Sequence, residues 1–243
     1  MPKSILEIND QQLAQVDYVL TDVDDTLTWQ GALPFESIQA LTLLSQLGVK
    51  VVAVTGACAG WCDQMAKLWP VYAVIGENGA FWMQKNQQGF QVQTWDSFST
   101  MQARQTQLKQ KLDALLLDYP EITYASDQAF RYADVAINIA QDRPKLDASI
   151  CAALLASIQQ MTVDGKRVHA TQSSVHINAW VGEYNKKTSA QAFVKQDSGA
   201  GQSDGENCLY IGDSANDVSM FEWLALSVGV SNIRSVLSQL TTP

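Results

Sequence analysis

Acidic and hydroxyl side chains follow three apolar, β-rich runs of this chain, at the points where strands would end. The run at residues 16–21 leads into Asp22-Val23-Asp24-Asp25, and the run at residues 50–55 ends in Thr55. A late run at residues 208–211 leads into Gly212-Asp213-Ser214-Ala215-Asn216-Asp217. Each pattern alone is also typical of a solvated turn. Together they place four carboxylates directly after strands, those of Asp22, Asp24, Asp213 and Asp217.

These residue types suit phosphoryl transfer. If the strands are parallel neighbours, their carboxyl ends meet at one edge of the sheet, where open α/β sheets bind ligands. Four carboxylates there repel one another unless a cation neutralises them. Oxygen ligands select a hard ion, and Mg²⁺ is the usual one where phosphate also binds. Asp22 can then attack phosphorus while Asp24, two residues on, protonates the departing oxygen.

The surrounding sequence predicts the sheet that this chemistry needs. Strand-like residues 16–21, 50–55 and 71–75 alternate with helical patterns at residues 34–47 and 61–69, which indicates parallel βαβ units. After a Ser- and Gly-rich loop predicted at residues 196–206, the pattern resumes with two strands and with helices at residues 216–224 and 232–240. The middle of the chain mixes short strands, at residues 81–83, 90–95, 131–139, 167–171 and 174–180, with helices at residues 100–117 and 146–159.

We therefore predict an α/β protein with two domains. A Rossmann-like parallel-sheet core domain is expected from residues 1–79 plus 185–243. An inserted α+β cap domain is expected from residues 80–184. A cleft should lie where the two domains meet, beside the clustered carboxylates.

Composition narrows the range of partners. The 243 residues carry 25 acidic and 16 basic side chains, a formal charge of -9, which is the wrong sign for nucleic acid or an anionic membrane. No secretory signal and no apolar run of roughly 20 residues is visible, so a cytoplasmic protein is expected. The four cysteines form no zinc-type CxxC pairs. A small phosphorylated metabolite remains a suitable partner, because a metal can reverse the field inside one cleft.

The chain resembles the haloacid dehalogenase superfamily. Its four motifs occur here in order as Asp22-Val23-Asp24-Asp25-Thr26, Thr55, a lysine in Asn185-Lys186-Lys187, and Gly212-Asp213-Ser214-Ala215-Asn216-Asp217. The sequence Glu77-Asn78-Gly79-Ala80 and the long insertion resemble the subgroup with a large α/β cap, which includes Cof-type hydrolases and the trehalose- and sucrose-phosphate phosphatases. The resemblance covers nearly the whole chain. It implies a Mg²⁺-dependent phosphatase that hydrolyses a small phosphate monoester, with a sugar phosphate favoured, through an aspartyl-phosphate.

The same resemblance assigns roles to the motif residues. Asp22 is the implied nucleophile, and Asp24 acts first as acid and then as base. Thr55 and the lysine hold the phosphoryl oxygens. Asp22, the backbone carbonyl of Asp24, and Asp213 bind Mg²⁺, with Asp217 as a further ligand or a supporting partner.

Two points of the pattern are less regular. Lys186 fits the tyrosine-acidic-lysine spacing of close relatives and is favoured, whereas Lys187 fits the lysine-x-x-alanine spacing of others. Relatives often carry Thr-Gly-Arg where this chain has Thr55-Gly56-Ala57, so one cation is missing.

Seven further residues are candidates for substrate contacts: Arg131, Ser174, His176 and Asn178 in the insert, and Asn78, Lys187 and Asn216 in the core. Two other functions stay open from the sequence. One is a phosphomutase, which uses the same aspartyl-phosphate on a similar capped fold. The other is a catalytically weak binding module, for which Ala57 is the only motivation. The substrate and the oligomeric state are not encoded in any motif.

Overall fold

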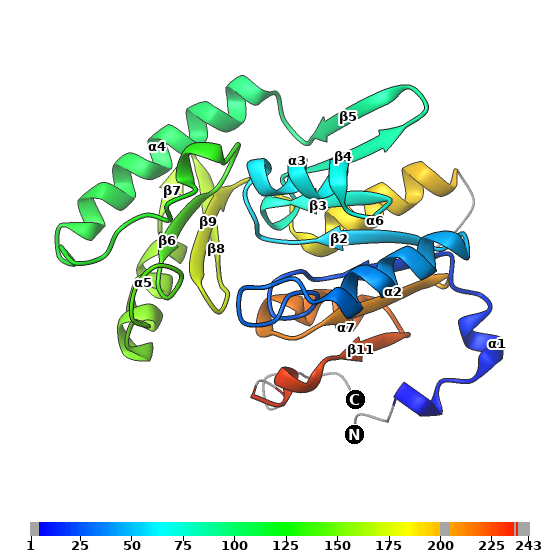
Figure 1. Ribbon diagram of the computed structural model, residues 1–243. Helices are drawn as coiled ribbons and strands as arrows, with labels where there is room; N and C mark the ends of the chain where they lie inside the picture. The colour runs from blue at the N-terminus through cyan, green and yellow to red at the C-terminus, as the bar shows by residue number, and fades with distance from the viewer. Residues whose placement is uncertain (1–4, 200–204, 236, 238–243) are drawn as a thin grey trace.

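The computed structural model describes residues 5–199, 205–235 and 237, which form two β-sheets with helices (Figure 1). The seven-stranded sheet has the order β11 (Ser227–Gly229), β10 (Cys208–Gly212), β1 (Tyr18–Thr21), β2 (Lys50–Val54), β3 (Ala73–Gly76), β4 (Phe81–Asn86), β5 (Gly89–Thr94). The four-stranded sheet has the order β6 (Val135–Asn138), β9 (His176–Val181), β8 (Lys166–Gln172), β7 (Thr162–Val163).

The α-helices are α1 (Asp10–Leu13), α2 (Phe35–Gln46), α3 (Ala59–Leu68), α4 (Phe98–Leu116), α5 (Ala148–Gln159), α6 (Lys186–Ser198) and α7 (Val218–Trp223). Short 3-10 helices are η1 (Ile5–Glu7), η2 (Glu77–Gly79), η3 (Gln128–Phe130), η4 (Ala215–Asp217) and η5 (Ser231–Ser235). Among the helices of the described residues, none is long and apolar enough to cross a membrane.

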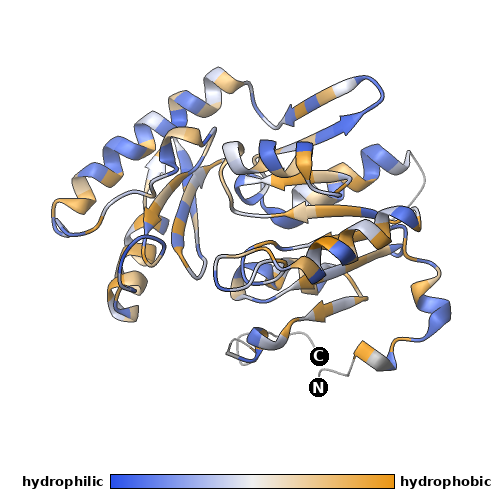
Figure 2. Ribbon diagram, viewed as in Figure 1, coloured by the Kyte–Doolittle hydropathy of each residue, from blue (hydrophilic) through white to orange (hydrophobic). Residues whose placement is uncertain are grey.

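The large sheet is parallel from β11 to β3, as predicted. Successive side chains of a strand point to opposite faces, and helices cover both faces here. Val19 and Val51 pack with Leu41 of α2, whereas Leu20 and Val52 pack with Phe193 of α6. Figure 2 shows the resulting concentration of hydrophobic residues in the central strands. Packing on both faces thus holds the central strands, and with them the residues at the strand ends, in place.

The boundary between core and insert differs from the expected one at residue 80. Strands β4 and β5 form a hairpin that pairs antiparallel with β3 and extends the core sheet. Phe81 and Met83 are fully buried there. The hairpin covers the edge that β3 would otherwise expose. The separate domain is therefore residues 98–181, which we call the cap.

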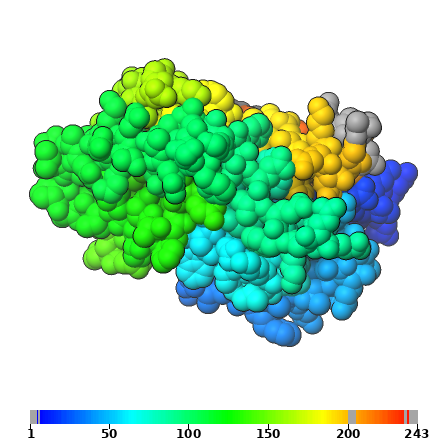
Figure 3. Space-filling view, turned by 90° about the horizontal axis from the view of Figure 1, so that it is seen from above, coloured from blue at the N-terminus to red at the C-terminus, as the bar shows by residue number. Residues whose placement is uncertain are grey.

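The cap is a four-stranded antiparallel sheet with two helices on one face. Leu108 of α4 and Leu154 of α5 pack against Ile137 and Ile177 of the sheet. Alternation along β9 turns His176, Asn178 and Trp180 to the opposite face. Figure 3 shows the cap (green) as one lobe beside the core. The predicted combination of a parallel-sheet core with an α+β cap is confirmed.

Three element predictions need adjustment. Residues 196–198 continue α6 instead of starting a loop, because Asp197 accepts hydrogen bonds from Tyr18, Lys50 and Tyr72 at the sheet; residues 200–204 of that loop lie outside the described residues. Residues 131–134 form a loop, and β6 begins at Val135. Of the helix predicted at residues 232–240, η5 covers the start, and residues 236 and 238–240 lie outside the described part.

Candidate active site

Asp22, Thr55 and Asp213 meet at the carboxyl edge of the core sheet. Strand β1 lies between β2 and β10, and Thr21 is level with Ala53 on one side and Ile211 on the other. The Asp22 N–H donates to the Ile211 carbonyl at 2.9 Å, which keeps the residue in register with its neighbour after the strand ends. The parallel topology thus brings the three predicted strand ends together.

Lys186 joins Asp22 to Asp217. Its Nζ donates to Asp22 Oδ1 and to Asp217 Oδ1, both at 2.8 Å, and lies 3.5 Å from Asn216 Oδ1. Asn185 positions it by capping α6: its side chain accepts from the Thr188 N–H at 2.9 Å. Although burial alone would lower it, the carboxylates raise the pKa of Lys186 above its usual value. Lys186 therefore stays charged.

The two candidate lysines are placed differently. Lys186 is 3% exposed and lies inside the acidic cluster. Lys187, the next residue on the helix, is partly exposed, and the Nζ that reaches Asp22 is that of Lys186. Asn216, a predicted substrate contact, instead accepts from Ser214 Oγ at 2.6 Å beside Lys186.

Three carboxylates form one cluster. Asp22, Asp213 and Asp217 each place an oxygen within 4.8 Å of the others, and all three are buried. Burial raises the pKa of Asp22 well above its usual range, with Lys186 opposing the rise and Asp217 adding to it. Burial, followed by the charge of Asp217, raises the pKa of Asp213 to about 6. A hard cation would relieve this repulsion, and the donors are the oxygens that Mg²⁺ prefers.

Side chains that the sequence did not single out hold the cluster in place. Tyr210 donates to Asp217 Oδ1 at 2.5 Å, and the N–H groups of Asp213 and Ser214 donate to Asp217 Oδ2 at 3.2 Å. Although burial would raise it, Lys186 and Tyr210 keep the pKa of Asp217 below its usual value. Asp217 is thus a fixed carboxylate.

Asp213 is oriented in the same way. Thr26 Oγ1 donates to Asp213 Oδ1 at 3.1 Å, and Asn232 Nδ2 donates to Asp213 Oδ2 at 2.8 Å. Thr26 lies within the first motif, so its proximity could have been predicted from that motif. No sequence pattern distinguishes Asn232 or Tyr210.

Thr55 and Asn78 form the opposite wall. Thr55 is fully buried, and its Oγ1 accepts from the Ala57 N–H at 3.0 Å. The Asn78 N–H donates to the Thr55 carbonyl at 3.0 Å. Asn78 is 4% exposed, and among the described residues its Nδ2 has no hydrogen-bond partner. This amide is a free donor beside Thr55.

Asp24 is acted on by charges from both the site and the cap. Its side chain is exposed, and its carboxylate is not part of the three-aspartate cluster. Loss of hydration among the surrounding groups nevertheless raises the pKa of Asp24, with Lys186 opposing and Asp25 adding. Arg131 and Asp127 of the cap also act on it electrostatically. Strand β8 lies against η4, so the cap covers the strand ends.

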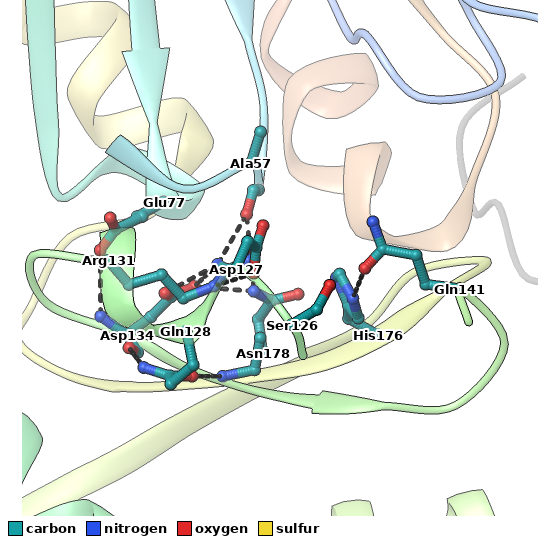
Figure 4. A network of polar contacts seen from close by, with 12 residues as sticks. Ala57, Glu77, Ser126, Asp127, Gln128, Arg131, Asp134, Gln141, His176 and Asn178 are labelled. Carbon is teal, nitrogen blue, oxygen red and sulfur yellow. Dashed lines mark hydrogen bonds and ion pairs between the residues drawn. The ribbon is translucent and has the colours of Figure 1, made fainter. Parts of the chain in front are cut away.

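Two of the four predicted cap residues, His176 and Asn178, are buried polar residues of β9 (Figure 4). His176 contacts Gln141 Oε1 at 2.6 Å, and burial, followed by Arg131, lowers its pKa to about 4. Asn178 Nδ2 donates to Asp134 Oδ2 at 2.7 Å and lies 3.5 Å from the Gly56 carbonyl. Ser174 is exposed in the turn before β9.

Arg131 differs from these residues. Its side chain is fully buried and forms ion pairs with Asp127 and Asp134. Its Nη1 also donates to the Gly56 carbonyl at 3.1 Å. The guanidinium is therefore engaged by the protein itself and does not offer an open face to a leaving group.

Comparison with known proteins identifies the family of the chain. A family model described as haloacid dehalogenase-like hydrolase matches residues 19–241. A phosphoglycolate phosphatase of Methanobrevibacter smithii is 21% identical over 226 residues, covering 92% of this chain and 89% of that protein.

Solved structures share the fold at low identity. The sucrose-phosphatase of Synechocystis sp. PCC6803 matches with a TM-score of 0.63 and 17% identity, covering 93% of this chain and 86% of that one. BT1666 of Bacteroides thetaiotaomicron, a phosphatase of the HAD superfamily, has a TM-score of 0.62 and 16% identity, covering 99% and 92%. The phosphatase-named relatives support the predicted enzyme class. The chain belongs to the haloacid dehalogenase-like hydrolases.

Proposed function

We propose that this hydrolase is a Mg²⁺-dependent phosphatase that transfers the phosphoryl group of a small phosphate monoester to Asp22. The observation that carries the proposal is the position of Asp22. It is a buried carboxylate at a strand end, held at 2.8 Å by Lys186 and within 4.8 Å of the Asp213 and Asp217 oxygens. A nucleophile so held is oriented before the substrate arrives.

The residues divide the reaction into two steps. An Asp22 oxygen attacks phosphorus, the bond to the leaving oxygen breaks, and Asp24 gives that oxygen a proton. In the second step Asp24, now ionised, takes a proton from water as the water attacks the phosphorus of the aspartyl-phosphate. The raised pKa of Asp24 favours this exchange of a proton near neutral pH.

The acidic cluster fits a divalent cation. Asp22, Asp213 and the backbone carbonyl of Asp24 would hold Mg²⁺, with Asp217 supporting from its fixed position. When bound, Mg²⁺ lowers the repulsion between the anionic nucleophile and the anionic phosphate. Lys186 and Thr55 contribute a positive charge and a hydroxyl for the phosphoryl oxygens, and the free Asn78 amide supplies a further donor.

The cap favours an uncharged leaving group, as in a sugar phosphate. His176 is held neutral by its low pKa, and Asn178 is an amide. The charged groups that act on His176 are Arg131, Asp127 and Asp142, and Arg131 is already paired with Asp127. A carboxylate on the leaving group would thus meet excess negative charge, whereas sugar hydroxyls can bond to neutral polar groups.

A phosphate-release assay tests both levels of the proposal. The probes are p-nitrophenyl phosphate, glucose 6-phosphate and 2-phosphoglycolate, each with Mg²⁺ and with excess chelator. We expect hydrolysis that chelation abolishes, and a higher kcat/KM for glucose 6-phosphate than for 2-phosphoglycolate. Undiminished activity in excess chelator would contradict the metal dependence. A preference for 2-phosphoglycolate would contradict the proposed preference for an uncharged leaving group, and would leave the metal dependence and the role of Asp22 unaffected.

A further inference from the structure

The cap is anchored to the core by a buried carboxylate. Glu77 lies in η2, directly after β3, and its side chain is fully buried. It accepts one hydrogen bond from the core, from the Ala59 N–H at 3.0 Å. It accepts three from consecutive cap residues, the N–H groups of Tyr132, Ala133 and Asp134, at 2.7 to 3.1 Å.

The anchored cap loop carries Arg131 (Figure 4). Arg131 donates from Nε and Nη2 to Asp127 and from Nη1 to Asp134. The planar guanidinium is therefore fixed from two sides. The same Nη1 donates to the Gly56 carbonyl in the core at 3.1 Å. Arg131 thus connects the cap to the residue that follows Thr55.

Each backbone carbonyl of the short loop 55–57 accepts a hydrogen bond. The Thr55 carbonyl accepts from the Asn78 N–H at 3.0 Å, and the Ala57 carbonyl accepts from the Glu77 N–H at 3.1 Å. Both of those donors belong to the core. The middle carbonyl, that of Gly56, accepts from Arg131 Nη1 at 3.1 Å and, more weakly, from Asn178 Nδ2 at 3.5 Å, and both donors belong to the cap. The loop geometry at Thr55 therefore depends on a cap residue.

We propose that Arg131 and Glu77 are positioning residues for Thr55: Glu77 fixes the cap loop on the core, and Arg131, so placed, fixes the peptide that orients the Thr55 hydroxyl. This inference rests on the proposed function, because it assumes that Thr55 holds the phosphoryl group. It has a distinct consequence. Loss of Arg131 impairs the reaction with every leaving group, since every substrate shares the phosphoryl group.

A double-mutant cycle tests the proposal. Arg131→Met, Thr55→Val and the double variant are assayed with p-nitrophenyl phosphate and with glucose 6-phosphate. We expect Arg131→Met to lower kcat/KM about 10- to 100-fold and by the same factor for both esters, as misplaced catalytic groups do. In the Thr55→Val background the same substitution should have little further effect, because the group through which it acts is gone.

The matched control is Arg143→Met. Arg143 also lies in the cap, but its guanidinium donates only to the cap carbonyls of Glu121 and Pro144 among the described residues. This variant should retain the wild-type kcat/KM for both esters.

Several results would overturn the proposal. Losses in kcat/KM that multiply in the double variant would show that Arg131 acts independently of Thr55, and a loss confined to glucose 6-phosphate would make Arg131 a substrate contact. If Arg131→Met does not fold, as judged by circular dichroism, Arg131→Lys and Glu77→Gln take its place in the same cycle. A wild-type protein that releases no phosphate from either ester removes the proposed function itself, a result distinct from multiplying losses in an active enzyme.

Discussion

Two regions of this molecule each gather three carboxylates around one buried cation. In the acidic cluster the carboxylates belong to Asp22, Asp213 and Asp217, and the cation is Lys186. At the junction of cap and core they belong to Glu77, Asp127 and Asp134, and the cation is Arg131. The charges are alike, but the hydrogen-bond donors are not.

At the junction the donors are abundant. Glu77 alone receives four backbone N–H groups, two on each oxygen. Burial, followed by the charge of Asp134, raises the pKa of Glu77 to about 8. Arg131 and the N–H groups of Tyr132 and Ala133 oppose this rise, because they stabilise the ionised carboxylate. In the cluster, Lys186 is the only described residue that donates to the Asp22 side chain. A carboxylate whose two oxygens both accept hydrogen bonds, such as that of Glu77, stabilises the fold. A carboxylate with a single donor, such as that of Asp22, keeps an oxygen free to react.

The largest effect on turnover should come from removing the Asp22 carboxylate. Asp22→Asn is expected to lower kcat about 10³-fold or more, because an amide cannot act as the anionic nucleophile. Its free energy of unfolding should change by only about 1 kcal/mol, since Lys186 keeps Asp217 as a partner. Phosphate release and denaturant unfolding measure the two quantities. Wild-type turnover in this variant would break the comparison.

Asp24→Asn should have a smaller and substrate-dependent effect. It keeps the backbone carbonyl but removes the acid and base, so turnover of glucose 6-phosphate should fall about 10²- to 10⁴-fold. With p-nitrophenyl phosphate, whose leaving group needs little protonation, the first step should be nearly spared. Rates for the two esters measured side by side check this; equal losses would argue against a proton donor at this position.

Glu77→Ala should act on stability. It leaves four backbone N–H groups without their acceptor in a buried junction, and breaking such a site costs about 3 to 5 kcal/mol of the free energy of unfolding. Glu121→Ala, which removes an exposed cap carboxylate, is the matched control and should cost about 0.5 kcal/mol or less. Urea denaturation gives both values. Equal effects would show that the junction is not the anchor.

The smallest predicted effect concerns His176. Its pKa is lowered from 6.5 to about 4, so between those values the unfolded chain takes up a proton that the folded protein does not. The contribution of His176 to the free energy of unfolding should therefore fall as pH drops below about 6.5, by about 2 kcal/mol at about pH 5, against the opposite contribution of buried acids such as Asp213, whose pKa is raised. His176→Gln should flatten this part of the profile. A variant with the unchanged pH dependence would place the titration elsewhere.

The sequence predicted the cluster better than the junction, and the reason is physical. Asp22, Thr55 and Asp213 follow apolar strands, and parallel topology alone brings such ends together. The choice between Lys186 and Lys187 needed the helix start at Asn185, which sets the direction of each side chain. The contacts between Glu77 and residues 132–134 join two domains. Hydrophobic periodicity predicts the elements within a domain but not how two domains pack against each other.

The domain boundary was misplaced for a related reason. Strands β4 and β5 alternate as strands of either domain would, and only pairing with β3 assigns them to the core sheet. The surroundings of Arg131 also depend on how the cap packs against the core. A polar residue in the insert suggested a substrate contact, whereas the fold supplies it with Asp127 and Asp134.

The most direct test of the central claim is to trap the phosphoryl group on the protein. Asp24→Asn enzyme turning over p-nitrophenyl phosphate with Mg²⁺ is quenched in acid, digested and analysed by mass spectrometry, with Asp22→Asn as the control. We predict one added phosphoryl group on the peptide that contains Asp22, and none in the control. A phosphoryl group on another residue, or an unmodified Asp22 peptide during measurable turnover, would contradict the role assigned to Asp22.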